Sequence, residues 1–283
     1  MFRINASEVA ALVGLNPFKD QNEAIQDCWN RNMKGLPPLE IMRARKVCAK
    51  NKEVDKAYDQ MIKDIKKTEN NTDVIQKKQE FSDNIKRIMT SKIDEKIMKT
   101  KCDFEQDVMY AESERDKRAI QREMNAKMNE LEKERTNALR EARDVEKVAI
   151  SKFNTNFGTR KETNIGKTYE EITGMNVEKT NKRHTWDIVP GKVEVVGRFD
   201  GFAEDGTLVE IKQRVRRLFG EVREYENVQV HVYMKMANVT SAQLVEKYED
   251  QLMVHDILYD DDFMIRIECE LEDVVKNYFT TDK

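Results

Sequence analysis

The segment Val193–Lys212 reads V-E-V-V-G-R-F-D-G-F-A-E-D-G-T-L-V-E-I-K, and it decides the fold. Its two ends, Val193–Phe199 and Leu208–Lys212, are rich in β-branched residues and predict strands. Between them, Glu204-Asp205-Gly206-Thr207 is a strong hairpin signal. The segment therefore predicts a piece of β-sheet at the centre of the C-terminal half of the chain.

The charged residues of this segment are of the kind that holds a divalent cation. Glu210 and Lys212 are two apart on a strand and therefore face the same side. Val209 and Ile211 alternate with them, as in a strand of a buried layer. Burying a charge is costly, so charged side chains on such a strand indicate a function. Together with Asp200 they suit Mg²⁺, which takes one or two carboxylates and keeps places for phosphate and water. The lysine would orient the nucleophile or stabilise the transition state. The alternative is a cross-strand ion pair on a solvated face.

The length of the turn decides whether the two carboxylates can share a metal. A two-residue turn at Asp205-Gly206 would set Asp200 opposite Ile211 and turn it away from Glu210. A three-residue turn, or a bulge near Gly201 or Gly206, restores the match, because glycine tolerates the backbone angles required. The sequence therefore predicts one of these two devices.

The rest of the C-terminal half mixes helical and strand patterns. Asn164–Thr173 predicts a helix that ends before a glycine, and Tyr225–Met236 has an ambiguous period. Ser241–Tyr248 predicts a helix, Met264–Cys269 a strand and Glu272–Tyr278 a closing helix. This alternation indicates an α/β layer architecture.

The middle of the chain has a different character. From Leu39 to Phe157 there is neither glycine nor proline, charges are dense, and apolar residues recur in steps of three and four. Such a narrow apolar seam predicts a long antiparallel coiled-coil hairpin, interrupted at Asn70–Thr72 and Thr100–Phe104. A spacer or an oligomerisation arm is its simplest role. The predicted division is 1–39 for the first part of a compact core, 40–152 for the arm and 153–283 for the main core.

Composition excludes several classes of protein. Among 283 residues, 50 are basic and 53 acidic, for a net charge of −3, so any contact with nucleic acid must come from a local basic patch. Since no apolar run is long enough to span a membrane, we expect no membrane partner. The four cysteines form no C-x-x-C pair, which argues against zinc and iron–sulfur sites. We expect a reducing intracellular compartment and no secretion.

Four stretches in order resemble one family. They are I-N-A-S-E-V-A-A-L-V-G-L-N-P-F (Ile4–Phe18), F-G-T-R-K-E-T-N-I-G-K-T-Y-E-E-I-T-G (Phe157–Gly174), the aspartate with E-I-K (Glu210–Lys212), and N-V-Q-V-H-V-Y-M (Asn227–Met234) followed by A-x-L-V. The set is similar to the PD-(D/E)XK nuclease superfamily, in its lambda-exonuclease and YqaJ-type viral recombinase branch. The resemblance implies an α/β (α+β) fold: a restriction-endonuclease-like core with a small mixed central sheet flanked by helices. The long helical insertion departs from compact family members.

The resemblance also implies roles for individual residues. Glu162, Asp200 and Glu210 would be ligands of Mg²⁺, with Mn²⁺ as a substitute, and the carbonyl of Ile211 would add another oxygen. Lys212 would be the catalytic lysine. The first glutamine of the family's helix motif matches Gln229, which would touch the site or the phosphate backbone, and this assignment makes Tyr225–Met236 a helix.

Other matches are partial. Ser7 matches the serine that helps to bind a terminal 5′-phosphate, and Arg3 would replace an arginine that the family has upstream. The second glutamine of the helix motif is His231 here. Simpler alternatives remain for three residues: Ser7 with Glu8 as a helix cap, Glu162 as a solvated carboxylate, and Gln229 as a packing residue.

A basic patch follows the E-I-K motif directly. We expect it to contact phosphates without reading sequence, through arginines that include Arg214, Arg216 and Arg217. Lys179, Lys182 and Arg183 form a second cluster.

These features predict a Mg²⁺-dependent DNA nuclease. Within that class they favour an exonuclease that acts on linear DNA in recombination or repair. The resemblance implies a viral or phage setting, in the host cytoplasm or nucleus, with a single-strand annealing protein as partner and a homo-oligomer in some members. The alternative is a coiled-coil interaction protein that grips DNA with a decayed nuclease core. The joint presence of Asp200, Glu210 and Lys212 argues against decay.

Overall fold

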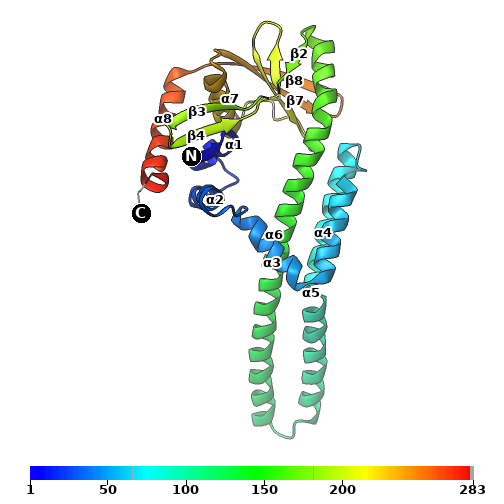
Figure 1. The fold of residues 1–283 in the computed structure, drawn as a ribbon. Coiled ribbons are helices and arrows are strands. Elements are labelled where there is room, and N and C mark those ends of the chain that lie inside the picture. Colours follow the sequence, from blue (N-terminus) through cyan, green and yellow to red (C-terminus); the bar gives the residue numbers. More distant parts are fainter. Residues whose placement is uncertain (66, 181, 281–283) are drawn as a thin grey trace. The chain divides into compact units, whose positions relative to one another are not determined.

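The computed structural model divides the chain into two compact units (Figure 1). One consists of Met1–Leu39 together with Thr155–Lys283, and the other of Glu40–Asn154. The structure describes the backbone except at residues 66, 181 and 281–283, and the side chains except at those positions and at 65, 159–164 and 166. Each unit is described by itself.

Two mixed sheets form the first unit. The three-stranded sheet has the order β1-β4-β3, with β4 (Val193–Gly197) between β1 (Phe2–Asn5) and β3 (His184–Val189). β1 is parallel to β4, and β3 is antiparallel to it. The first residues of the chain are thereby tied to a strand from its C-terminal half.

The five-stranded sheet has the order β2-β5-β6-β7-β8. Its strands are β2 (Val177–Lys179), β5 (Gly201–Ala203), β6 (Leu208–Gln213), β7 (Ser241–Tyr248) and β8 (Gln251–Leu258). β6 and β7 are parallel, and the other pairs are antiparallel. The mixed α/β class predicted from the sequence is confirmed, although the strands are shared between two sheets rather than gathered in one.

The hairpin that precedes β6 has the predicted three-residue turn. Gly201 pairs with Val209 and Phe202 with Leu208, a register that continues to Asp200 opposite Glu210. The Ala203 N–H donates to the Thr207 carbonyl at 2.8 Å, so the turn consists of the three residues between them, Glu204–Gly206. Gly206 in this turn has a positive φ of 86°. One expectation was wrong: β4 is not the partner of β6, because the chain bends after Gly197 and the short β5 takes the hairpin.

Helices cover the two faces of the five-stranded sheet differently. One face meets an apolar core that contains Leu208 of β6 and residues of four helices: α1 (Ala6–Leu12), α2 (Gln21–Lys34), α7 (Glu224–Ala237) and α8 (Asp261–Val274). A π-helical turn at Val275–Phe279 follows α8. Val209 and Ile211 point to a second core with Ile165 and Tyr169, from the end of the long helix α6. β6 therefore separates the two cores, and every second side chain faces α7.

Two predicted elements in this unit were wrong. Ser241–Tyr248 is strand β7 rather than a helix, because it pairs along its length with both β6 and β8. Met264–Cys269 lies within helix α8 rather than in a strand: Asp260 caps the helix by accepting from the Phe263 N–H at 2.9 Å, and Met264, Ile267 and Leu271 are buried at helical spacing.

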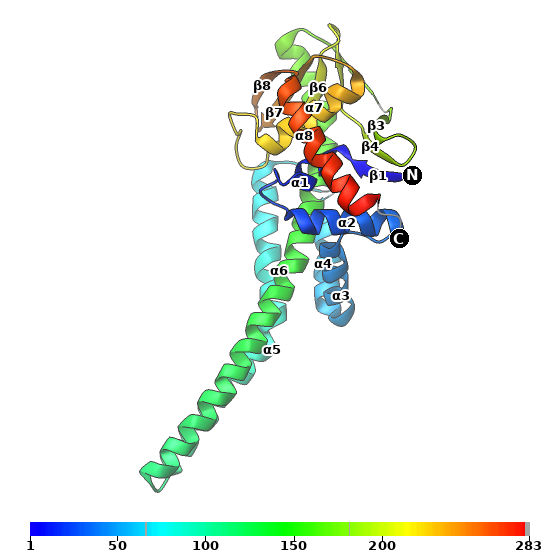
Figure 2. The same cartoon turned by 90° about the vertical axis from the view of Figure 1, so that its left-hand side faces the viewer.

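The second unit is helical. It contains α3 (Leu39–Lys50, from Glu40 on), α4 (Lys52–Ile65), α5 (Asn71–Tyr110) and the first part of α6 (Glu114–Thr173). α5 and α6 run antiparallel, as Figures 1 and 2 show, and ion pairs join them: Lys86–Glu146, Asp94–Arg135 and Lys96–Glu134. This confirms the predicted helical hairpin.

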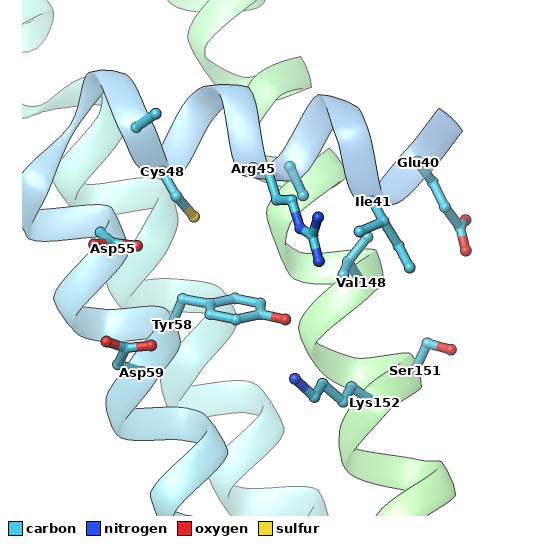
Figure 3. Close-up of a pocket in the computed structure, with 12 residues that line it drawn as sticks. Glu40, Ile41, Arg45, Cys48, Asp55, Tyr58, Asp59, Val148, Ser151 and Lys152 are labelled. Atoms are coloured by element: carbon cyan, nitrogen blue, oxygen red, sulfur yellow. The ribbon is translucent and has the colours of Figure 1, made fainter. Parts of the chain in front are cut away.

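The breaks in the helical unit were predicted in part. Asn70 caps α5 by accepting from the Asp73 N–H, at the first predicted interruption. Thr100–Phe104 is no interruption, because α5 continues to Tyr110 and the chain turns at 111–113. A cavity of about 610 Å³ lies between α3, α4 and α6, and Arg45, Tyr58 and Lys152 line it (Figure 3).

Two general expectations concern the membrane and the cysteines. Among the described residues, no helix is long and apolar enough to cross a membrane. The four cysteines are free thiols.

Candidate active site

Strand β6 carries the central pair of charged side chains. Glu210 and Lys212 alternate with core residues and therefore face α7, where Lys212 Nζ donates to Glu210 Oε1 at 2.7 Å. The Glu210 side chain is 7% exposed and that of Lys212 is 23% exposed. Burial by itself lowers the pKa of the lysine, but the attraction of the Glu210 carboxylate outweighs it and raises that pKa. The lysine is therefore a charged donor at neutral pH.

Helix α7 supplies the third member of this group. The Gln229 side-chain oxygen accepts from Lys212 Nζ at 3.3 Å, and its nitrogen lies 3.4 Å from Glu210 Oε1 and donates to the Tyr233 hydroxyl at 2.8 Å. Burial raises the pKa of Tyr233 to about 12, so its hydroxyl keeps its proton. The structure thus brings Glu210, Lys212 and Gln229 together, and it adds Tyr233.

Asp200 approaches the same strand from the bend before β5. Its Oδ2 accepts from the Ile211 N–H at 2.7 Å, and the register of the hairpin sets it opposite Glu210. Burial raises the pKa of the Asp200 carboxyl, and the Ile211 N–H and Lys212 offset this only in part. Glu162 lies in α6, but its side chain is outside the described residues.

The chemistry of this group fits a hard divalent cation. One carboxylate, Glu210, lies on β6, and the other, Asp200, lies in the bend before the neighbouring strand β5. Burial disfavours the ionised form of Asp200 and raises its pKa, and a cation bound nearby would offset that cost. Among the described residues, however, no group of three or more His, Cys, Asp or Glu side chains is close enough to hold a metal. The described donors thus amount to two carboxylates and the main chain of Ile211.

A cavity of about 420 Å³ lies beside this group. Ser7, Arg183, Arg198 and Tyr233 line it, so that it brings a hydroxyl and two guanidinium groups to one place. Gly197 is needed at its wall, because a Cβ there would come within 2.7 Å of the Tyr233 ring. The first glycine of G-R-F-D-G thus lets Tyr233 approach the sheet.

The second glycine of that motif, Gly201, is needed for the same kind of reason. A Cβ at this position would come within 2.6 Å of the Glu178 carbonyl oxygen on β2. Close packing, rather than a positive φ, therefore explains both glycines.

The two N-terminal site predictions have different outcomes. Ser7 lines the cavity, and it does not cap α1: the cap is Asn5, whose N–H donates to Glu8 Oε2 at 3.1 Å. Arg3 was expected to bind phosphate, and this stays a prediction. Its Nε donates to Glu194 Oε1 at 2.7 Å, and it is not among the residues that line the cavity.

The predicted DNA contact at Arg214 is wrong. Its guanidinium makes two hydrogen bonds to Glu226, at 2.7 and 2.9 Å, and one to Glu246 at 2.7 Å, with the side chain 9% exposed. A phosphate would have to displace two buried carboxylates, so Arg214 is part of the core. Arg216 and Arg217 are exposed, as a phosphate contact requires.

His231, which stands where the family motif has its second glutamine, serves the fold. Its Nδ1 lies 2.9 Å from the Asn227 carbonyl, and its Nε2 accepts from the Asp260 N–H at 3.2 Å, next to the start of α8. Burial lowers the pKa of His231, so it stays neutral as this acceptor. The side chain therefore joins α7 to α8 and is no part of the candidate site.

Sequence reasoning missed two residues of the site. Arg198 stands inside G-R-F-D-G, next to the glycine that opens the cavity, and that position was the available signal. Tyr233 is four residues after Gln229, which is one turn along the same face of a helix. Once Tyr225–Met236 is assigned to a helix, this spacing points to Tyr233.

No family model and no curated protein matches the sequence. Among solved structures, the chain is similar to an alkaline exonuclease, LHK-Exo from Laribacter hongkongensis, with a TM-score of 0.39 and 20% identity over 44% of this chain and 68% of that chain. The complex of LHK-Exo with dAMP matches with a TM-score of 0.37 and 19% identity, over 43% and 66% of the two chains. A phage-related exonuclease from Haemophilus somnus 129PT matches with a TM-score of 0.36 and 14% identity, over 44% and 70%.

Proposed function

We propose that this protein is a Mg²⁺-dependent deoxyribonuclease that acts as an exonuclease on linear DNA, in recombination or repair. The observation that carries the proposal is the contact of the partly buried Lys212 with both Glu210 and Gln229, beside a cavity that two arginines line. A partly buried lysine held against a carboxylate, beside a cavity lined by two arginines, is suited to phosphodiester hydrolysis.

The proposed ligands of the cation are Asp200, Glu210, the Ile211 carbonyl and, through the resemblance of its helix, Glu162. A bound Mg²⁺ would supply an activated water and would offset charge that develops on phosphorus. The chain itself contributes preorganisation: the Ile211 N–H fixes one oxygen of Asp200 at 2.7 Å and leaves the other oxygen for the cation.

Lys212 has the role of a charged donor in this proposal. Because Glu210 raises its pKa, the ammonium keeps its proton, stabilises a negatively charged phosphate oxygen in the transition state, and is unsuited to act as a base. Gln229 holds the ammonium from the other side, at 3.3 Å, and so fixes its direction.

The cavity next to Tyr233 is proposed to hold the phosphate at the end of the strand. Guanidinium groups bind phosphate oxygens through paired hydrogen bonds, and Arg183 and Arg198 offer two such groups, with the Ser7 hydroxyl as a further donor. Arg216 and Arg217, both exposed, would add contacts to the backbone that do not depend on sequence.

The experiment compares end-labelled linear duplex DNA with a closed circle of the same sequence, with Mg²⁺ and with EDTA. Wild type should release labelled nucleotides from the linear DNA only with Mg²⁺, and it should leave the circle intact. Lys212→Ala should lower the rate by orders of magnitude, whereas Lys192→Ala, at an exposed lysine of the same unit, should not change it.

Binding of linear DNA by wild type without any Mg²⁺-dependent cleavage would contradict the proposal and favour the DNA-gripping alternative. Cleavage of the closed circle would be consistent with nuclease activity but would refute the proposal that the protein acts as an exonuclease. Equal rates for wild type and a well-folded Lys212→Ala would refute the site.

A further inference from the structure

A second cavity in the same unit is aromatic. It has a volume of about 550 Å³, in the usual range for small-ligand sites, and it is lined by Phe18, Phe219 and Tyr225 together with Arg223. We call these four residues the aromatic pocket. Phe18 is 72% exposed, which is unusual for a large apolar side chain. It lies within the turn Asn16–Lys19, where its N–H donates to Asn16 Oδ1 at 2.9 Å.

The ring of Phe18 is available for stacking. It contacts Tyr225 in a T-shaped arrangement, with ring centroids 5.6 Å apart and an interplanar angle of 82°. Such a contact uses the edge of one ring and the face of the other, so Tyr225 leaves at least one face of Phe18 uncovered. A flat ligand can therefore stack on it.

The floor of the aromatic pocket is anchored to the core. The Phe219 N–H donates to Glu246 Oε2 at 2.9 Å, and the guanidinium of Arg214 lies over the Phe219 ring at 4.0 Å. Arg214 in turn binds Glu226 and Glu246, both buried. This buried network holds the loop before α7 and fixes Phe219, so a ligand does not have to order that wall of the pocket.

The aromatic pocket also lies in line with the candidate active site. Tyr225, Gln229 and Tyr233 are four residues apart on α7 and therefore share one face of the helix. Tyr225 lines the aromatic pocket, Gln229 contacts Lys212 and Glu210, and Tyr233 lines the basic cavity. Each step is about one helical turn, roughly 6 Å, so a nucleotide next to the cleaved bond comes within reach of the aromatic pocket.

Charge around the aromatic pocket suits a nucleic acid strand. Arg216 and Arg217 are exposed in the loop that contains Phe219, and the Arg223 guanidinium lies 4.9 Å from the Phe219 ring. Arg223 also binds Glu221, at 2.6 Å, and the exposed Glu224 lines the pocket, so the cations free to meet a strand are the two exposed arginines of the neighbouring loop. Aromatic rings beside cations are the usual means of binding single-stranded nucleic acid without reading its sequence.

We propose that the aromatic pocket binds a nucleobase of the substrate strand, stacked on Phe18, on the far side of the candidate active site from the basic cavity. This inference rests on the proposed function. It adds a base-binding site that selects strands with bases over bare phosphate backbone, whatever their sequence.

The test measures binding in EDTA, so that no cleavage occurs, by fluorescence anisotropy. One probe is a labelled short oligothymidylate, and the other has the same backbone with abasic sites in place of the bases. Phe18→Ala should weaken binding of the oligothymidylate about ten-fold and leave binding of the abasic probe unchanged. Phe18→Tyr, which keeps a ring, should bind both probes as wild type does. Tyr278→Ala, at an exposed aromatic residue outside the pocket, is the matched control.

Unchanged binding of the oligothymidylate by Phe18→Ala, or an equal loss for both probes, would overturn the inference. Cleavage of linear DNA by wild type separates this result from the proposed function. If wild type cleaves and Phe18→Ala binds as wild type does, the base site is refuted and the nuclease stands. If wild type does not cleave but the loss depends on the bases, the nuclease is refuted and the base site stands.

Discussion

Arg214 shows how burial decides what a charged residue does. In the sequence it is one of several arginines that follow E-I-K, and nothing in its own neighbourhood distinguishes it from Arg216 or Arg217. Its partners Glu226 and Glu246 come from α7 and β7, 12 and 32 residues further along the chain. The motif residues Asp200, Glu210 and Lys212 could be identified from local spacing, whereas the choice of buried arginine depends on contacts between distant segments.

Removing the Arg214 guanidinium should therefore damage folding. Arg214→Ala leaves Glu226 and Glu246, 3% and 0% exposed at the side chain, as buried carboxylates without it. We expect the free energy of unfolding to fall by about 3–5 kcal/mol, measured by urea denaturation. Arg216→Ala, at an exposed position, should change it by about 0.5 kcal/mol or less. A loss below about 1 kcal/mol in Arg214→Ala would show that the network is not part of the core.

At the scale of elements, local patterns predicted the strands around the hairpin but not those that depend on distant pairing. β6 follows from its β-branched alternation and from the turn that precedes it. Ser241–Tyr248 has no such local signal, because it becomes a strand by lying between β6 and β8. In Asp261–Val274 a short alternation hid a longer helical period, and the cap at Asp260 was the signal that could have revealed it.

The cap of α8 can be tested directly. Asp260 accepts from the Phe263 N–H at 2.9 Å, so Asp260→Ala should lower the free energy of unfolding by about 1 kcal/mol. Asp262→Ala, at an exposed acidic residue in the first turn of the same helix, should have a smaller effect. Equal effects of the two substitutions in thermal or urea unfolding would argue against the cap.

At the scale of the whole molecule, the chain leaves the first unit after Leu39 and returns to it at Thr155. The absence of glycine and proline between these points allowed a helical hairpin to be predicted, and α5 and α6 form it. The break at Asn51 between α3 and α4 was not predicted, because its signal is a single asparagine whose side chain accepts from the Glu53 N–H at 3.0 Å.

We propose that the first unit folds without the second. Replacing 40–154 by a short flexible linker should leave a protein with a single cooperative unfolding transition, because each unit buries its own apolar residues. Circular dichroism during heating measures this. Loss of the cooperative transition would show that the helical unit is needed for the fold of the first unit.

If Asp200 and Glu210 hold a cation beside Lys212, as proposed, then Mg²⁺-dependent cleavage of linear duplex DNA depends on the charge of Asp200, and the cleavage rate of Asp200→Asn measures this. The substitution keeps the shape of the side chain and removes its charge. We expect the rate to fall by at least about 1000-fold while the unfolding midpoint stays close to that of wild type. Asp187→Asn, at an exposed aspartate on β3, should cleave as wild type does. A folded Asp200→Asn protein that cleaves at the wild-type rate would show that no cation held by Asp200 and Glu210 takes part in cleavage.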